Sequence, residues 1–257
     1  LNQDGIKVVH TLDEITYKPE SLYIYSSAIP IESDRFKDFY NKENVLSRPE
    51  YLKNLSENHK IIGITGTHGK TSTTALLSHI FHFNNVNVSY LYGGITTFNG
   101  IGGHYGDPDQ PLILETDEAF NTFEKIKISD LLVLNVDSDH LDYFKNLDNY
   151  KDAFYKVMKN VTDNLVINND DLNIKSMKEL KNPVSYGKDI AADFKVQSPG
   201  TFIYENNKYE IKSDIIGDHF KANMLGAIIL ALLNGIEIKD SLNAIESFAG
   251  VKRRIEL

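Results

Sequence analysis

The chain has 257 residues, of which 41% are hydrophobic and 25% are charged, as expected for a soluble globular protein of one or two domains. A net charge of −9 argues against a broad nucleic-acid-binding surface, and the absence of cysteine excludes disulfides and thiolate chemistry. No apolar run approaches the roughly 18 residues of a membrane span, and the first residues lack a signal-peptide pattern.

The first 57 residues have the pattern of a partial α/β domain. The predicted strands are Ile6 to Val9, Leu22 to Tyr25 and a short strand at Val45. The predicted helices are Ser33 to Tyr40 and Glu50 to Leu55. We expect a domain boundary near Asn58.

Residues 58–250 alternate between strand-like and helix-like segments, a pattern typical of a parallel sheet with crossover helices. The predicted strands are Ile61 to Thr65, Asn87 to Tyr92, Leu112 to Leu114, Leu131 to Leu134 and Leu165 to Ile167. The predicted helices are Lys70 to Phe83, Leu147 to Met158, Phe220 to Asn234 and Ile238 to Phe248. A small antiparallel part is predicted at Ala192 to Val196, Thr201 to Tyr204 and Lys208 to Ile211. The glycine-rich stretch from Gly93 to Gly103 is predicted to be a flexible loop.

A glycine loop joins the first of these strands to the following helix. Its sequence is Gly66-Thr67-His68-Gly69-Lys70-Thr71-Ser72, so a lysine and several backbone N–H groups meet at a helix N-terminus, where phosphate binds well. A strict P-loop has another glycine at the position of Ile64, so the generic pattern fails by one residue. The alternative is an ordinary strand-to-helix turn, which leaves the lysine beside a positive helix end unexplained.

Two further polar groups follow apolar strands, namely Glu115-Thr116-Asp117-Glu118 and Asn135-Val136-Asp137-Ser138-Asp139-His140. Ligands of open parallel sheets bind beyond the carboxyl ends of the strands, so we expect these groups to converge with the glycine loop. Magnesium prefers oxygen ligands and is often shared with phosphates, and the Thr71 hydroxyl would suit it. Taken singly, each group also fits a solvated loop or a helix cap.

These motifs together resemble those of the Mur ligases. The resemblance rests on the glycine loop, Asp117-Glu118, the segment from Asn135 to His140, the run Gly217-Asp218-His219-Phe220-Lys221-Ala222-Asn223, and Arg253-Arg254. It covers nearly the whole chain and is strongest from Ile62 to Arg254. The glycine loop of that family also lacks the first glycine, which accounts for Ile64.

The resemblance implies a role for each matching residue. Lys70 would bind the ATP phosphates within the loop formed by Gly66, Thr67, His68, Gly69 and Ser72. Thr71 and Glu118 would hold magnesium, and His140 would bind a second magnesium near the γ-phosphate. Asn223 would contact adenine, with His219 in the same nucleotide site. Arg254 would approach the phosphates when a further domain closes.

The resemblance also implies an activity, the ATP-dependent formation of an amide through an acyl phosphate in peptidoglycan precursor synthesis. Phe154 stands where ligases of the later steps carry a carbamylated lysine, which favours the alanine-adding class, with UDP-N-acetylmuramate and L-alanine as substrates. Such an enzyme would serve cell-wall growth, cell shape and division in the cytoplasm, with no nucleic-acid or membrane partner. The alternatives are a relative that adds a peptide or another amino acid, and a non-catalytic nucleotide-binding module.

Two departures from the family pattern bear on these alternatives. Phe220 replaces the usual asparagine after His219, so a side chain that could hydrogen-bond to ATP is lost. Ala119-Phe120 replaces the usual continuation of the acidic motif.

The implied fold is α/β, with a partial N-terminal Rossmann-like domain for the UDP substrate at residues 1–57. A P-loop-type central ATP-binding domain with a mainly parallel sheet and a small antiparallel part would span residues 58–250. Residues 251–257 would form a hinge into a C-terminal domain that the sequence lacks. Because the chain begins at Leu1 and ends inside an alternating apolar and charged segment, we expect a fragment that binds nucleotide weakly and turns over little.

Overall fold

The computed structural model describes residues 14–26, 29, 36–40, 42–96, 100, 102–117, 123–137, 144–177, 180–252 and 255–256. The chain divides into two compact units, Leu1–Leu55 and Ser56–Leu257. The three domain ranges expected from the sequence stay a prediction. The predicted strand from Ile6 to Val9 lies outside the described residues.

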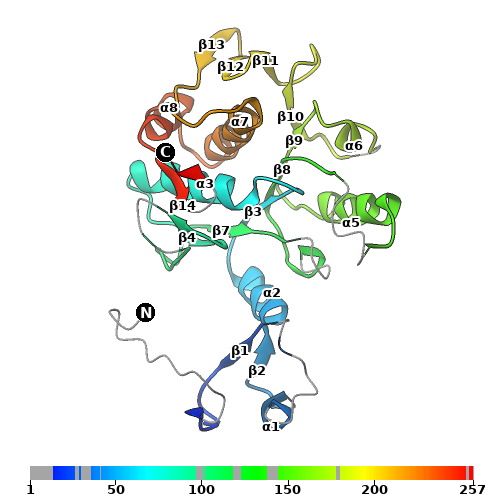
Figure 1. Ribbon diagram of the computed structural model, residues 1–257, viewed down its shortest axis with the longest axis vertical. Coiled ribbons are helices and arrows are strands. Elements are labelled where there is room, and N and C mark those ends of the chain that lie inside the picture. The colour runs from blue at the N-terminus through cyan, green and yellow to red at the C-terminus, as the bar shows by residue number, and fades with distance from the viewer. Residues whose placement is uncertain are drawn as a thin grey trace. The chain divides into compact units, whose positions relative to one another are not determined.

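The first unit contains a pair of parallel strands, β1 (Tyr23–Tyr25) and β2 (Val45–Ser47) (Figure 1). The short helix α1 (Lys37–Tyr40) lies between them in the chain, and α2 (Arg48–Asn58) follows β2 directly. Helix α2 begins with a capping box, because the Ser47 backbone N–H donates to Glu50 at 2.7 Å while the Glu50 N–H donates to the Ser47 hydroxyl at 3.4 Å. The predicted strand at Leu22 to Tyr25 is confirmed as β1.

The second unit is built on a ten-stranded sheet, counted over the described residues, with the order β13-β12-β11-β10-β9-β8-β3-β7-β4-β6. The strands from β11 to β4 in this order are parallel neighbours, and β12, β13 and β6 are antiparallel edges. The parallel strands are β3 (Ile61–Thr65), β4 (Ser89–Leu91), β7 (Leu112–Glu115), β8 (Asp130–Val133), β9 (Asn164–Asn168), β10 (Val184–Gly187) and β11 (Phe194–Ser198). The antiparallel strands are β12 (Thr201–Tyr204), β13 (Asn207–Glu210) and β6 (Gly103–His104).

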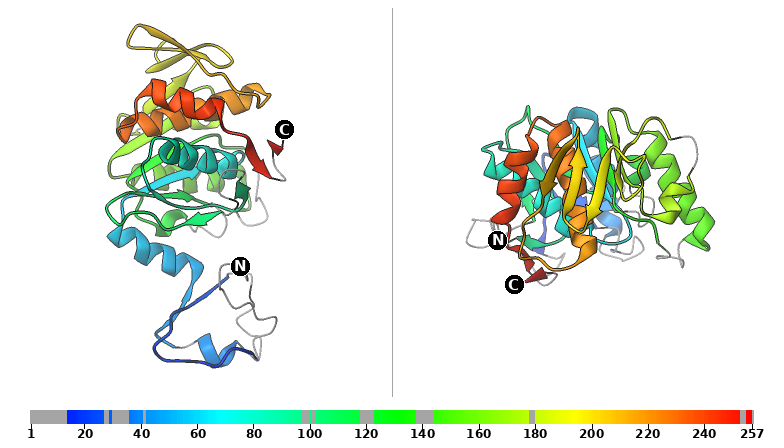
Figure 2. Two further views of the ribbon diagram at one scale, coloured as in Figure 1. Left: turned by 90° about the vertical axis from the view of Figure 1, so that its left-hand side faces the viewer. Right: turned by 90° about the horizontal axis from the view of Figure 1, so that it is seen from above.

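Helices cover both faces of this sheet. Helices α3 (Lys70–Phe83), α7 (Asp218–Leu233) and α8 (Ile238–Glu246) pack on one another, while α5 (Leu147–Lys159) lies on the opposite side of the strands (Figure 2). The short helices η4 (Phe123–Lys125) and α6 (Leu172–Lys175) complete the unit. Every residue of β3 is buried, as expected for a central parallel strand with both faces covered. The predicted mainly parallel α/β sheet with an antiparallel part is therefore confirmed.

The prediction of a flexible loop from Gly93 to Gly103 is partly wrong. This stretch contains β5 (Ile95–Thr96) and the start of β6, and β5 pairs with β14 (Gly250–Lys252), which pairs with β15 (Ile255–Glu256). Strand β10 was also not predicted. Strands β5 and β6 have two residues each, which is too short for an alternating pattern, and β5 forms because the distant β14 provides its partner.

No described helix is both long enough and apolar enough to cross a membrane.

Candidate functional site

The glycine loop lies between β3 and α3 and is held by the segment that follows β8. The His68 N–H donates to the Asn135 side-chain oxygen at 2.8 Å, and the Asn135 amide donates back to the His68 carbonyl at 2.9 Å. The Thr67 N–H donates to the Asn135 carbonyl at 3.1 Å. A Cβ on Gly66 would lie 3.0 Å from that same carbonyl, so the close approach requires glycine. The loop shape therefore depends on a neighbouring strand as well as on its own sequence.

The Lys70 ammonium lies over this loop. It donates to the Gly66 carbonyl at 2.7 Å and approaches the Thr67 carbonyl at 3.4 Å, and the side chain is partly buried. Helix α3 starts at Lys70 from Gly69, whose φ of 89° is left-handed and which offers no side-chain cap. The helix N-terminus and the ammonium thus concentrate positive charge on one short stretch of backbone, which suits a phosphate group.

A second group joins the start of α3 to the end of β7. The buried Thr71 hydroxyl donates to Glu115 Oε1 at 2.7 Å, and Glu115 Oε2 accepts from the Gly93 N–H at 2.7 Å. In the sheet, Glu115 is the register partner of Ile64, so its carboxylate lies at the level where the glycine loop begins. A threonine hydroxyl and a carboxylate beside a phosphate-binding loop are ligands that fit Mg²⁺, which otherwise keeps waters and phosphate oxygens.

Sequence reasoning placed Glu115 in the acidic group after β7 but chose Glu118 as the ligand. The signal that favours Glu115 is its place as the last residue of the buried strand, directly at the carboxyl edge. Glu118 lies outside the described residues, and so do His140 and Arg254. Their predicted roles therefore stay predictions.

The segment that leads toward His140 is fixed as far as the structure describes it. The Asp137 N–H donates to the Thr67 hydroxyl at 2.8 Å, and that hydroxyl lies 3.1 Å from the hydroxyl of Tyr150. The Val136 N–H donates to Asp171 Oδ2 at 3.1 Å. Residues 134–137 are therefore tied both to the glycine loop and to the start of α6.

The N-terminus of α7 forms the opposite wall of the site. It starts after Gly217, which has a φ of 123° and gives no side-chain cap, so α3 and α7 both present uncapped first turns. Asn223 is 8% exposed and lies against Gly69, where an added Cβ would collide with its side-chain amide. The rings of His219 and Phe220 are 4.2 Å apart between centroids.

These walls enclose a pocket of about 560 Å³, which we call the loop pocket. It is lined by His68, Gly69, Ser72, Asn135, His219, Phe220 and Asn223. Of the predicted loop residues, the structure places His68, Gly69 and Ser72 in this pocket with His219 and Asn223. Phe220, which replaces the usual family asparagine, lines the same pocket. Within the described ranges, no group of three or more His, Cys, Asp or Glu side chains is arranged to hold a metal ion by itself.

The chain is similar to known proteins in sequence and in fold. Residues 64–231 match the family model described as the Mur ligase middle domain. The UDP-N-acetylmuramate–L-alanine ligases of Clostridium botulinum strain Langeland and of Dictyoglomus turgidum are 34% and 30% identical to the chain. Each alignment covers 100% of this chain but only 59% and 58% of the relative, so the chain spans about three fifths of their length.

Solved structures share the fold. The UDP-N-acetylmuramate–alanine ligase of Thermotoga maritima matches with a TM-score of 0.82 at 24% identity, over 100% of this chain and 61% of that one. The UDP-N-acetylmuramate:L-alanyl-γ-D-glutamyl-meso-diaminopimelate ligase of Neisseria matches with a TM-score of 0.76 at 22% identity, over 90% of this chain and 80% of that one.

Proposed function

Since the chain belongs to the Mur ligase family, we propose that it carries the ATP-binding part of an enzyme that joins L-alanine to UDP-N-acetylmuramate. The observation that carries the proposal is that Lys70, the first turn of α3 and the Thr71–Glu115 pair lie together at the carboxyl edge of the sheet, beside the loop pocket. The alanine-adding choice is supported by relatives of that name at 34% identity and by Phe154 in place of a carbamylated lysine.

The chemistry requires two anions to meet, because the sugar carboxylate must approach the γ-phosphate of ATP. Lys70 and the backbone N–H groups of the glycine loop would bind the phosphates and offset their charge. Thr71 and Glu115 would hold magnesium, which, when bound, neutralises phosphate charge. The predicted ligands Glu118 and His140 and the predicted phosphate contact of Arg254 belong to the same proposal.

The proposed reaction has two steps. A carboxylate oxygen attacks the γ-phosphorus, the bond to the ADP oxygen breaks, and an acyl phosphate forms. The alanine amine then attacks the acyl carbon, the amide bond forms, inorganic phosphate leaves and the amine loses a proton. A site closed to water protects the acyl phosphate until the amine arrives. We place this reaction in peptidoglycan precursor synthesis in the cytoplasm.

The test uses the complete protein that contains this chain. We expect ADP formation that requires ATP, UDP-N-acetylmuramate and L-alanine together, with the amide product identified by mass spectrometry. ADP formation that does not depend on UDP-N-acetylmuramate or L-alanine would contradict the proposal. A preference for a tripeptide over L-alanine would instead favour the relative that adds a peptide.

A second candidate is a nucleotide-binding module without catalysis, and Phe220 is the observation that favours it. A phenyl ring cannot replace the hydrogen bonds of an amide, although it lines the loop pocket. Calorimetry with Mg²⁺ and a non-hydrolysable ATP analogue, together with the turnover assay, separates the two candidates. Tight binding without turnover dependent on the other substrates would favour the module.

A further inference from the structure

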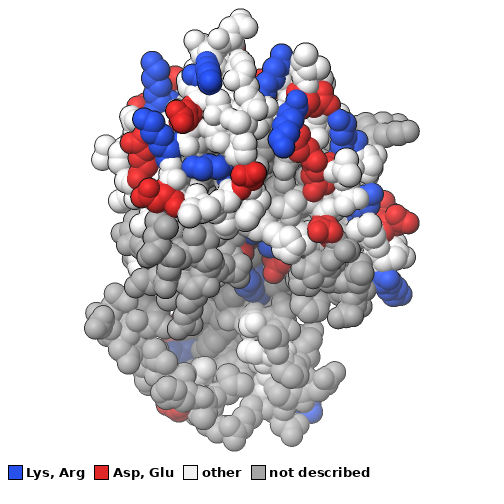
Figure 3. All heavy atoms as spheres, turned by 45° about the horizontal axis from the view of Figure 1, so that its top comes forward, with Lys and Arg blue, Asp and Glu red and all other residues white. Residues whose placement is uncertain are grey.

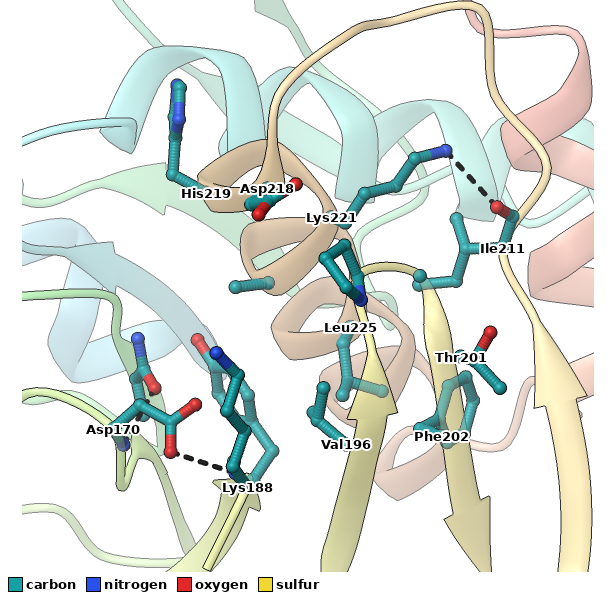
Figure 4. Close-up of a pocket in the computed structure, with 16 residues that line it drawn as sticks. Asp170, Lys188, Val196, Thr201, Phe202, Ile211, Asp218, His219, Lys221 and Leu225 are labelled. Atoms are coloured by element: carbon teal, nitrogen blue, oxygen red, sulfur yellow. Dashed lines mark hydrogen bonds between the residues drawn. The ribbon is translucent and has the colours of Figure 1, made fainter.

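A second cavity lies on the other face of α7. Its volume is about 200 Å³, and Figure 4 shows it between α7, the ends of β9 and β10, and the strands β11 and β12. We call it the rear cavity. Of the residues that line it, His219 also lines the loop pocket.

The floor of the rear cavity is apolar. Phe202, Ile211 and Leu225 line it and are almost fully buried, and Val196 lines it from β11. Tyr186 also lines it and is fully buried, and its hydroxyl has no hydrogen-bond partner among the described residues. This hydroxyl is inaccessible and lies toward Gly226 of α7, so Tyr186 contributes its ring to the floor and offers no hydrogen bond to a ligand.

The rim of the rear cavity carries both signs of charge. Asp170 lies at the end of β9, where its Oδ1 accepts from the Lys188 N–H at 2.8 Å. The Lys188 ammonium and the Asp218 carboxylate make no ion pair or hydrogen bond with any described residue. Basic and acidic side chains are mixed over the described part of the surface that Figure 3 shows.

Lys221 is different from these rim residues because its ammonium is already engaged. It donates to the Ile211 carbonyl at 3.1 Å and to the Ser213 carbonyl at 3.3 Å, and Figure 4 shows it turned toward Ile211. It therefore ties α7 to the segment after β13 and closes one side of the cavity. The charges available to a ligand are those of Asp170, Lys188 and Asp218.

We propose that the rear cavity binds a free amino acid with an aliphatic side chain of about leucine size. A zwitterion matches a rim with both charges, because its ammonium would face a rim carboxylate, Asp170 or Asp218, while its carboxylate would face Lys188. Its side chain would lie on the apolar floor, and a volume of about 200 Å³ accommodates roughly nine non-hydrogen atoms. This site goes beyond the proposed function, since it lies outside the loop pocket and needs no nucleotide.

Because His219 lines both sites, we expect binding at one site to influence the other. A ligand that restrains His219 from the rear cavity changes the arrangement of one wall of the loop pocket, and the effect on the two affinities is reciprocal. We therefore expect L-leucine to change the affinity for an ATP analogue several-fold.

The binding test needs only this chain and small probes, so it does not depend on the ligase reaction. Calorimetry and NMR titration would compare L-leucine with 4-methylpentanoate, which lacks the ammonium, and with 3-methylbutylamine, which lacks the carboxylate. We expect L-leucine to bind with a Kd of about 1 mM or tighter and each analogue to bind at least about 10-fold more weakly. Absence of saturable binding, or equal binding of all three probes, would overturn the proposal.

Variants locate the site. Ala222→Leu fills the cavity from a partly buried position of α7 and should abolish binding, and Lys188→Gln should weaken it about 10-fold. Lys195→Gln is the matched control, because Lys195 is exposed and precedes Val196 on β11, so its side chain points to the other face of the strand. Thermal unfolding confirms that each variant folds. If Ala222→Leu and Lys188→Gln bind L-leucine like the parent chain, the site is elsewhere and the proposal is wrong.

Discussion

The loop pocket and the rear cavity lie against opposite faces of α7 but are built from different materials. The loop pocket is lined by His68 and Gly69 of the glycine loop, Ser72 of α3, Asn135 after β8, and side chains from the start of α7. The rear cavity consists of apolar side chains from β11, β12 and α7 with a charged rim. The difference shows that a site built around a continuous glycine loop leaves a sequence motif, whereas a site made by packing leaves none.

Replacing Lys70 tests the loop pocket most severely. We expect Lys70→Ala in the complete protein to lower the rate of ADP formation by on the order of 10²–10³-fold, because the charge that offsets the phosphates is lost. Binding of L-leucine in the rear cavity should not change. Lys195→Ala, which replaces an exposed lysine outside both sites, serves as the control. If Lys195→Ala lowered the rate as much as Lys70→Ala, the assignment would be contradicted.

Glu115 and Glu118 compete for the role of magnesium ligand. If Glu115 is the ligand beside Thr71, Glu115→Gln should raise the Mg²⁺ concentration needed for half-maximal activity by about 10–100-fold, since the variant has a neutral oxygen at the same place. Glu118→Gln is the matched comparison. A large effect of Glu118→Gln with none for Glu115→Gln would restore the choice made from the sequence.

Substitution of two glycines tests the two faces of α7, since Gly69 packs against Asn223 on one face and Gly226 lies within the helix near Tyr186. Gly69→Ala puts a side chain at a φ of 89° against Asn223, so we expect a loss of stability of about 1–3 kcal/mol and weaker nucleotide binding. Gly226→Ala puts a Cβ 2.8 Å from Leu132 and 3.1 Å from the Tyr186 hydroxyl. It should cost a similar amount of stability by overpacking and should disturb the rear cavity instead.

The measurements for this pair are chemical unfolding and titration with an ATP analogue and with L-leucine. The comparison between the two faces would fail if Gly226→Ala weakened nucleotide binding more than L-leucine binding. It would also fail if Gly69→Ala weakened L-leucine binding more than nucleotide binding.

His79 tests the scaffold away from both pockets, where the smallest effect is expected. Burial lowers the pKa of this imidazole below its ordinary value of 6.5, although hydrogen bonding to the Ala244 carbonyl at 3.0 Å opposes the shift. Because the unfolded chain then binds the proton more readily, the folded state loses stability as the pH falls below about 6.5. His79→Gln, which does not titrate, should make the melting temperature less dependent on pH between roughly 7.5 and 5.5. An equally steep dependence in the variant would assign the effect to other groups.

Much of the loop pocket was predicted from the sequence. Gly66, Gly69, Lys70 and Thr71 lie close together in the chain, and their order between an apolar run and a helix already predicts a phosphate-binding turn. His219 and Asn223 were reached through the family resemblance. The long elements were also predicted, because α3, α5 and α7 each span at least three turns.

Only the tertiary structure determined the contacts between residues that are distant in the sequence. Asn135 and His68 are hydrogen-bonded although they lie 67 positions apart in the sequence, and Glu115 and Thr71 are hydrogen-bonded although they lie 44 positions apart. Strand β5 pairs with β14 only because the fold brings them together. The rear cavity likewise draws on residues from Asn168 to Leu225. Periodicity and motif spacing are local properties of a chain, so they determine helices, strands and turns. Contacts between remote side chains depend on how those elements pack.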